Sequence, residues 1–153
     1  SFLNRFTRVK VDPLTREDLL FIALRQHGSL DRDCVEKMIR LNELLHRRTM
    51  VDCTLGQEGW PWDFNLRDVL RWCQLVAAAS SSPALSSSAP AVVHAFDAVY
   101  RQRLRSLADR AKADAAYAEV FGAPPLAPAF APSVAVAAAG VTIGSASIPA
   151  AQA

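Results

Sequence analysis

The chain has 153 residues, and the 51% that are apolar suffice for the core of one domain of ordinary size. Its formal net charge of +2 is too small to indicate nucleic-acid binding by itself. Three cysteines without a CxxC pair argue against a disulfide framework or a zinc site, and predict buried thiols in a reducing compartment. The opening residues are charged where a signal peptide is apolar, and the missing initiator methionine predicts a piece of a larger protein.

The first elements are a short strand and a helix. Residues 6–11 (FTRVKV) alternate apolar and polar side chains, which predicts a strand that ends at Asp12 and Pro13. Thr15 and Asp18 form a capping-box pair ahead of an apolar run, which predicts a helix over 15–26 that ends near Gly28. Because one strand forms no sheet alone, we expect its partners upstream of residue 1.

Two more helices are predicted before the middle of the chain. Asp31 is a cap for a helix over 31–48, in which apolar residues recur at helical spacing. Segment 50–63 holds two glycines and a proline and is predicted to be a loop or short hairpin. Asn65 opens a helix over 65–78 that is apolar over much of its surface, so we expect it to be well buried.

The second half combines low-complexity segments with helical ones. Residues 77–91 are rich in serine and alanine and are predicted to be a flexible surface insertion. A helical region follows over 91–121, with a break near Ser106, which caps a new helix, and a stop at Gly122. The composition of the tail over 123–153 predicts that it is mostly disordered, with a short strand at 141–143.

The sequence contains no recognisable self-contained active site. There is no GxxxxGK[ST] phosphate loop and no GxGxxG motif. His27, His46 and His94 lie in unrelated segments, and the cysteines have no histidine at a known catalytic spacing. The uncharged tail after Glu119 is interrupted by proline and glycine and is mostly alanine, so it is not predicted to span a membrane.

Two arginines are candidates for phosphate binding. Arg5 precedes the predicted strand, and Arg67 lies in the first turn of the helix over 65–78. The planar guanidinium binds phosphate oxygens well and stabilises charge at a γ-phosphate during hydrolysis. The plainer alternative is that Arg5 is a surface charge and that Arg67 pairs with Asp63 or Asp68.

Four aromatic residues gather in the same region, and they also permit two interpretations. They could stack on nucleic-acid bases, but such a cluster more often packs in the hydrophobic core. These residues are Trp60, Trp62, Phe64 and Trp72.

Three blocks of the sequence resemble consecutive segments of the midasin family of dynein-related AAA+ ATPases. They are SFLNRFTRVKVDPLT at 1–15, WPWDFNLRDVLRWCQL at 60–75 and YRQRLRSLADRAKADAAYAEVFG at 100–122. The family string PWEFNLRDxxRWC is long and unusual, so this resemblance is specific. Asp63 stands where the family usually has glutamate, and the Ser/Ala insertion and the tail match poorly.

The resemblance implies a mainly α fold. Residues 1–14 would be the end of the large subdomain of an AAA+ module, with its finger and the last strand of its α/β core. Residues 15–122 would be the helical lid subdomain, with the insertion at 77–91. Residues 123–153 would be an Ala/Pro-rich, low-complexity tail or linker.

The resemblance also implies roles for single residues. Arg5 resembles the arginine finger, which points into the nucleotide site of the neighbouring module. Arg67 resembles the sensor-2 arginine, which reaches the γ-phosphate of its own module's nucleotide, and Asn65 lies beside it. A helix N-terminus adds a favourable field for an anion there. The implied cofactors are ATP and Mg²⁺, bound in the parent protein. This chain lacks the phosphate loop, the Walker B acids and sensor 1, so its own nucleotide site is incomplete. The isolated chain is therefore expected to be inactive.

The implied parent remodels large-ribosomal-subunit precursors in the nucleus, in both nucleolus and nucleoplasm. The implied partners are the neighbouring AAA+ modules of the same chain and, through the parent, the precursor particles. Direct contact with nucleic acid or membrane is not expected. Two alternatives stay open: a lid of a MoxR-type or chelatase-type AAA+ protein, and a helical protein-interaction domain without a nucleotide role. The string PWDFNLRD favours the midasin family over the MoxR or chelatase type. An unpaired strand at 6–11 would expose a sheet edge that favours aggregation, which argues against a free-standing interaction domain.

Overall fold

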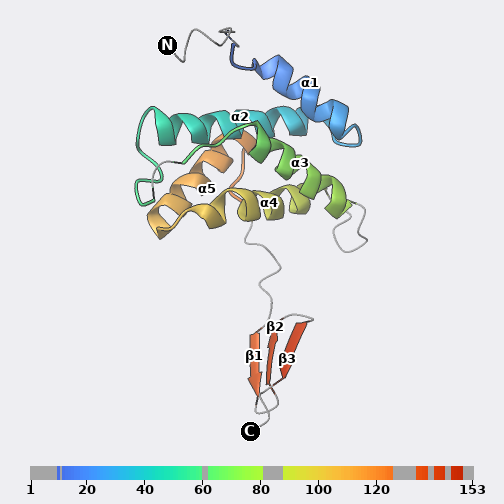
Figure 1. Cartoon of the computed structure of the whole chain (residues 1–153), viewed down its shortest axis with the longest axis vertical. Coiled ribbons are helices and arrows are strands. Elements are labelled where there is room, and N and C mark those ends of the chain that lie inside the picture. The colour runs from blue at the N-terminus through green and yellow to red at the C-terminus, as the bar shows by residue number, and fades with distance from the viewer. Residues whose placement is uncertain are drawn as a thin grey trace, which may run out of the picture.

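The computed structural model describes residues 10, 12–59, 62–80, 88–125, 134–137, 140–143 and 146–149. These residues form five α-helices that pack into one helical body, followed by a small antiparallel sheet (Figure 1). The fold is therefore mainly helical, as predicted. Arg5 and, apart from Lys10, the strand expected over 6–11 lie outside the described residues.

The first two helices begin where their caps predict. Helix α1 (Arg16–Gln26) starts with a complete capping box, in which Thr15 Oγ accepts from the Asp18 amide and Asp18 accepts from the Thr15 amide. Helix α2 (Arg32–Met50) starts with Asp31, whose carboxylate accepts from the Cys34 amide at 2.9 Å. Both predicted starts are confirmed, because a cap needs only residues that are close in sequence.

The next helices extend into the Ser/Ala stretch. Helix α3 (Leu66–Ser80) and helix α4 (Ser88–Val99) together take up both ends of 77–91, so only 81–87 lies outside the described residues. The prediction of a flexible insertion over all of 77–91 was therefore wrong at both ends. Alanine is the best helix former, and Ala79, in the added end of α3, packs partly buried against the core, so propensity and packing agree in lengthening α3.

A short 3-10 helix, η3 (Arg101–Arg103), joins α4 to the last helix, α5 (Leu107–Phe121). The expected break near Ser106 is confirmed, since Ser106 Oγ accepts from the Asp109 amide at 3.1 Å. Gly122 ends α5 in the left-handed conformation, with φ of 83°. Helix α5 packs against α2, and Arg48 of α2 forms an ion pair with Glu119 near the end of α5.

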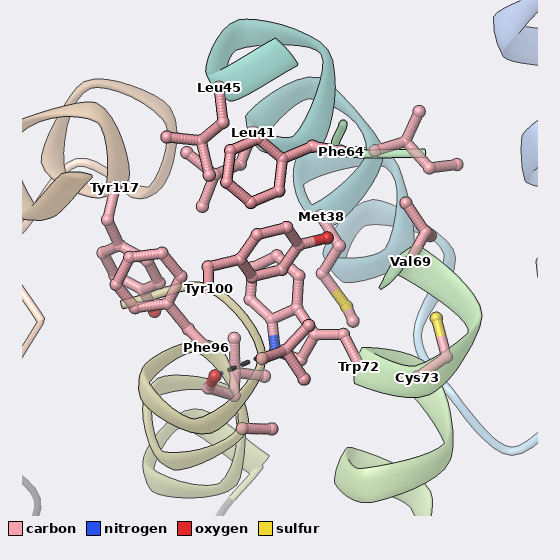
Figure 2. Packing of buried hydrophobic residues seen from close by; sticks show 14 of the residues in the cluster. Met38, Leu41, Leu45, Phe64, Val69, Trp72, Cys73, Phe96, Tyr100 and Tyr117 are labelled. Atoms are coloured by element: carbon pink, nitrogen blue, oxygen red, sulfur yellow. Dashed lines mark hydrogen bonds between the residues drawn. The ribbon is translucent and has the colours of Figure 1, made fainter. Parts of the chain in front are cut away.

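Aromatic side chains form the centre of the helical body (Figure 2). Trp72 is fully buried, and its indole N–H donates to the Val92 carbonyl at 3.0 Å. The Trp72 ring meets the Tyr100 ring edge-on, with 5.2 Å between centroids. Phe64 is also buried and Trp62 is partly buried, so the core interpretation is confirmed for these three aromatic residues, while Trp60 lies outside the described residues.

The tail contains an antiparallel sheet of β1 (Val134–Ala137), β2 (Gly140–Ile143) and β3 (Ala146–Pro149). The expected strand at 141–143 is confirmed, but the expectation of a mostly disordered tail was wrong for the residues of these strands. Alternating β-branched and small residues favour extended backbone, which alanine content alone does not reveal. No described strand contacts a described helix, and no described helix is long and apolar enough to cross a membrane.

Candidate functional site

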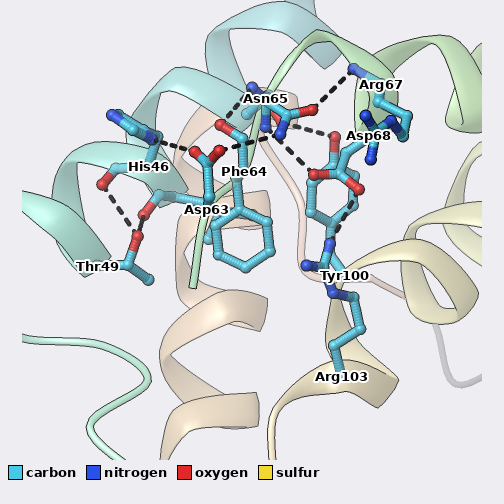
Figure 3. Close-up of polar contacts among 11 residues, drawn as sticks. His46, Thr49, Asp63, Phe64, Asn65, Arg67, Asp68, Tyr100 and Arg103 are labelled. Carbon is cyan, nitrogen blue, oxygen red and sulfur yellow. Dashed lines mark hydrogen bonds and ion pairs between the residues drawn. The ribbon is translucent and has the colours of Figure 1, made fainter. Parts of the chain in front are cut away.

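The segment from Asp63 to Asp68 builds the start of α3 (Figure 3). Asn65 Oδ1 accepts from the Arg67 amide at 3.0 Å, and Asp68 Oδ2 accepts from the Asn65 amide at 3.2 Å. The other end of the Asn65 side chain donates to Asp63 Oδ2 at 3.1 Å. The amides at this helix end are thus bonded by local side chains, which fixes where the first turn of α3 lies.

Arg67 projects from this first turn and is exposed. Within the described part of the chain, its guanidinium makes no hydrogen bond or ion pair. The two acids expected as its alternative partners are engaged elsewhere. Asp63 Oδ1 lies 3.5 Å from His46 Nδ1, and Asp68 Oδ1 lies 2.9 Å from Arg103 Nη1. The plainer interpretation of Arg67 as the ion-pair partner of these acids is therefore wrong, because a distant arginine occupies Asp68.

Arg103, which is half-buried, forms an ion pair with the buried carboxylate of Asp68 at the start of α3 (Figure 3). The Asp68 side chain is only 8% exposed, and burial of a carboxylate is strongly unfavourable without a charged or hydrogen-bonding partner. The Arg103 guanidinium also lies 5.0 Å from the centre of the Phe64 ring and 5.8 Å from that of Trp62. A positive charge over an aromatic face is favourable, so Arg103 binds both the helix and the segment that leads into it.

A second polar connection runs through the core. The Tyr100 hydroxyl donates to Asn42 Oδ1 at 3.0 Å, and Asn42 Nδ2 donates to the Phe64 carbonyl at 3.4 Å. Burial raises the pKa of Tyr100 well above its ordinary value, and the negative charge of Asp68 adds to this shift. Tyr100 therefore stays a neutral donor and links α2 to the entry of α3.

The other titratable candidates form no site with Arg67. His46 is 45% exposed and lies beside Asp63, and the described residues contain no group of three potential metal ligands. Burial raises the pKa of the Cys73 thiol to about 12 and also raises that of Cys34. Cys53 is exposed in the turn after α2, with a φ of 51°, and Cys34 is only half-buried. The prediction of buried thiols is therefore confirmed for Cys73, holds in part for Cys34 and was wrong for Cys53.

The contacts of Asp68 with Arg103 and of Asn42 with Tyr100 were not anticipated from the sequence. The partners are 35 and 58 residues apart, so no local pattern connects them. One signal was present, since Asp68 lies in the second and Arg103 and Tyr100 in the third of the blocks quoted above. The structure shows that these two blocks form one contact network.

Comparison with known proteins gives a family match over the helical body. The family model described as the midasin AAA lid domain matches residues 18–124. Midasin of Dictyostelium discoideum is 38% identical over 121 residues, which are 79% of this chain and 2% of that protein. Midasin of Giardia intestinalis is 29% identical over 76 residues, which are 50% of this chain and 2% of that protein. The chain thus spans about 2% of the length of these curated relatives. No solved structure gives a significant match.

Proposed function

The chain belongs to the midasin AAA lid family, and on this premise we propose that it is the lid of one AAA+ module in a midasin-like ATPase, with Arg67 as its nucleotide sensor. The observation that carries the proposal is the exposed Arg67 guanidinium at the first turn of α3, which has no partner in the described part of the chain. Asp63 accepts a hydrogen bond from Asn65 and Asp68 pairs with Arg103, and neither acid pairs with Arg67, so Arg67 is free to meet an external anion.

The chemistry of this position suits a phosphate. Arginine offers several donors in a fixed plane that matches phosphate oxygens, and the helix N-terminus adds a field that favours negative charge. We therefore assign Arg67 to the γ-phosphate of its own module's nucleotide. Asn65 is exposed and orders the same turn through the Arg67 amide, which supports its assignment to the nucleotide side.

The remaining assignments rest on the resemblance of the sequence blocks. Arg5, within SFLNRF, is proposed as the arginine finger directed at the neighbouring module. ATP and Mg²⁺ are proposed to be held mainly by parts of the parent protein outside this chain. The parent is proposed to act on large-ribosomal-subunit precursors in the nucleus, and the lid to rotate against neighbouring modules as nucleotide binds and leaves.

The test of Arg67 uses the full-length protein that contains this lid, with the phosphate loops of its other modules disabled so that only this module binds ATP. We expect Arg67→Ala to weaken binding of a fluorescent ATP analogue about tenfold, as loss of one charge-assisted hydrogen bond predicts. Arg71→Ala is the matched control, because Arg71 is exposed one turn further along α3 and makes no hydrogen bond or ion pair to described residues.

Two results count against the sensor role of Arg67. One is an unchanged affinity for the analogue in Arg67→Ala. The other is an equal loss in Arg71→Ala, which would indicate a general effect of positive charge on α3. Binding of the analogue by the isolated chain is expected to be absent, and micromolar binding there would show that the lid holds more of the site than this proposal allows.

A further inference from the structure

We propose that Arg103, acting through Asp68, is a positioning residue that holds the first turn of α3 in the orientation that presents Arg67 to the nucleotide. The proposal rests on the function proposed for Arg67. It assigns a role to the block at 100–122, which contains Arg103; the family match alone assigns no role to this block. Arg103 itself does not touch the nucleotide; it acts by fixing the turn from which Arg67 projects.

The connection from Arg103 to Arg67 is continuous in the structure. Arg103 Nη1 bonds one oxygen of Asp68 at 2.9 Å, and the other Asp68 oxygen accepts from the Asn65 amide at 3.2 Å. Asn65 Oδ1 in turn accepts from the Arg67 amide at 3.0 Å. Since Asp68 is only 6% exposed, little water is available to replace Arg103 if it is removed.

Arg103 also fixes the segment before the helix. Its guanidinium lies over the rings of Phe64 and Trp62, at 5.0 and 5.8 Å from their centres. A flat, delocalised cation can stack on rings while it bonds a carboxylate, and a lysine ammonium fits this double contact less well. Both sides of the α3 start, the incoming segment and the first turn, are therefore tied to one side chain.

The element that carries Arg103 is itself firmly held. Tyr100, just before η3, is fully buried and bonds Asn42 of α2. Arg101 bonds Asp97 of α4 at 3.1 Å and Asp114 of α5 at 3.0 Å. Arg103 thus extends from a fixed support towards α3, whereas Arg101 joins only α4 and α5.

This difference makes Arg101 a matched control. Arg101→Gln removes two ion pairs from the same 3-10 helix without touching α3, so it accounts for any general loss of stability. Arg103→Gln removes the contact to Asp68, and Arg103→Lys keeps the charge but not the planar group.

The experiment measures hydrogen exchange and ATP-analogue affinity in the full-length protein, with the other modules disabled as above. We expect Arg103→Gln to speed amide hydrogen exchange at the start of α3. We also expect it to weaken binding of the ATP analogue about tenfold, which is the range for loss of one charge-assisted hydrogen bond. Arg103→Lys should recover part of both losses, and Arg101→Gln should change neither. In the Arg67→Ala background, Arg103→Gln should cause no further loss of affinity, because its effect passes through Arg67.

The results separate this proposal from the function on which it rests. An equal effect of Arg101→Gln, or an affinity loss from Arg103→Gln that persists in full without Arg67, overturns the positioning role. Unchanged exchange at the start of α3 in Arg103→Gln also overturns it. If instead Arg67→Ala leaves affinity unchanged while Arg103→Gln still speeds exchange there, the link between Arg103 and α3 stands and the sensor function of Arg67 fails.

Discussion

Tyr100 is the residue at which the buried polar contacts of the lid meet its aromatic core. Its ring packs against Trp72, Phe96 and Phe64, and its hydroxyl donates to Asn42. Asn42 is only 4% exposed, so its amide depends on protein partners. A single hydroxyl therefore supports the contact between α2 and the segment that leads into α3.

The hydroxyl of Tyr100 can be tested without disturbing the packing of its ring. We expect Tyr100→Phe to lower the free energy of unfolding by about 1–2 kcal/mol, because the buried Asn42 oxygen loses its donor. Urea denaturation followed by circular dichroism measures this change. Tyr117→Phe is the control, since the Tyr117 hydroxyl makes no hydrogen bond to described residues, and it should have little effect. A neutral Tyr100→Phe would mean that the bond to Asn42 contributes nothing to stability.

At the scale of elements, the helices are defined by their ends as much as by their apolar faces. Thr15, Asp31 and Ser106 each accept a hydrogen bond from an amide in the first turn of the helix that follows. Gly122 ends α5 with a positive φ. There is room for a side chain at this position, since an added Cβ would meet nothing within 4 Å. Glycine is favoured here only because it adopts the left-handed backbone conformation without strain.

A pair of glycine substitutions tests this reading of the α5 terminus. We expect Gly122→Ala to cost about 1 kcal/mol, because an L-residue is strained in the left-handed region. Gly28→Ala should be neutral or slightly stabilising, since Gly28 lacks a positive φ and an added Cβ would lie an ordinary 3.5 Å from the Leu24 carbonyl. Thermal or urea unfolding of both variants measures the difference, and equal costs would contradict the conformational argument.

At the scale of the molecule, the helical body and the sheet are separate units among the described residues. Residues paired across the strands share a face, so Val134 and Val136 lie on the same face as Val141, Ile143 and Ile148. Much of this apolar face is exposed, with Val136 at 78% and Ile148 at 65%. The family match ends at residue 124, before the sheet begins.

Removal of the sheet tests whether the lid depends on it. We expect truncation after Pro125 to leave the helical circular dichroism and the urea midpoint unchanged, because no described strand contacts a described helix. We also expect less binding of a hydrophobic dye, since the exposed apolar face is removed. A lower urea midpoint in the truncated chain would show that the tail stabilises the helical body.

The sequence by itself was sufficient for the helical class, for the caps at Thr15, Asp31 and Ser106, and for the stop at Gly122. These features depend on residues a few positions apart, so their physical cause is contained in a short stretch of chain. It was insufficient for the extent of α3 and α4 within 77–91, where Ala79 packs partly buried against the core.

Only the tertiary structure decided which charges are free. The sequence left Asp68 open as a partner for Arg67, but adjacent residues on a helix do not face each other. Instead, the Arg103 side chain reaches Asp68 from 35 residues away. The burial of Asp68 makes that pairing necessary, because a carboxylate removed from water needs a cation or several donors. Arg67 is exposed and has no ion-pair partner among the described residues, so this property of a candidate phosphate ligand is visible only in the folded chain.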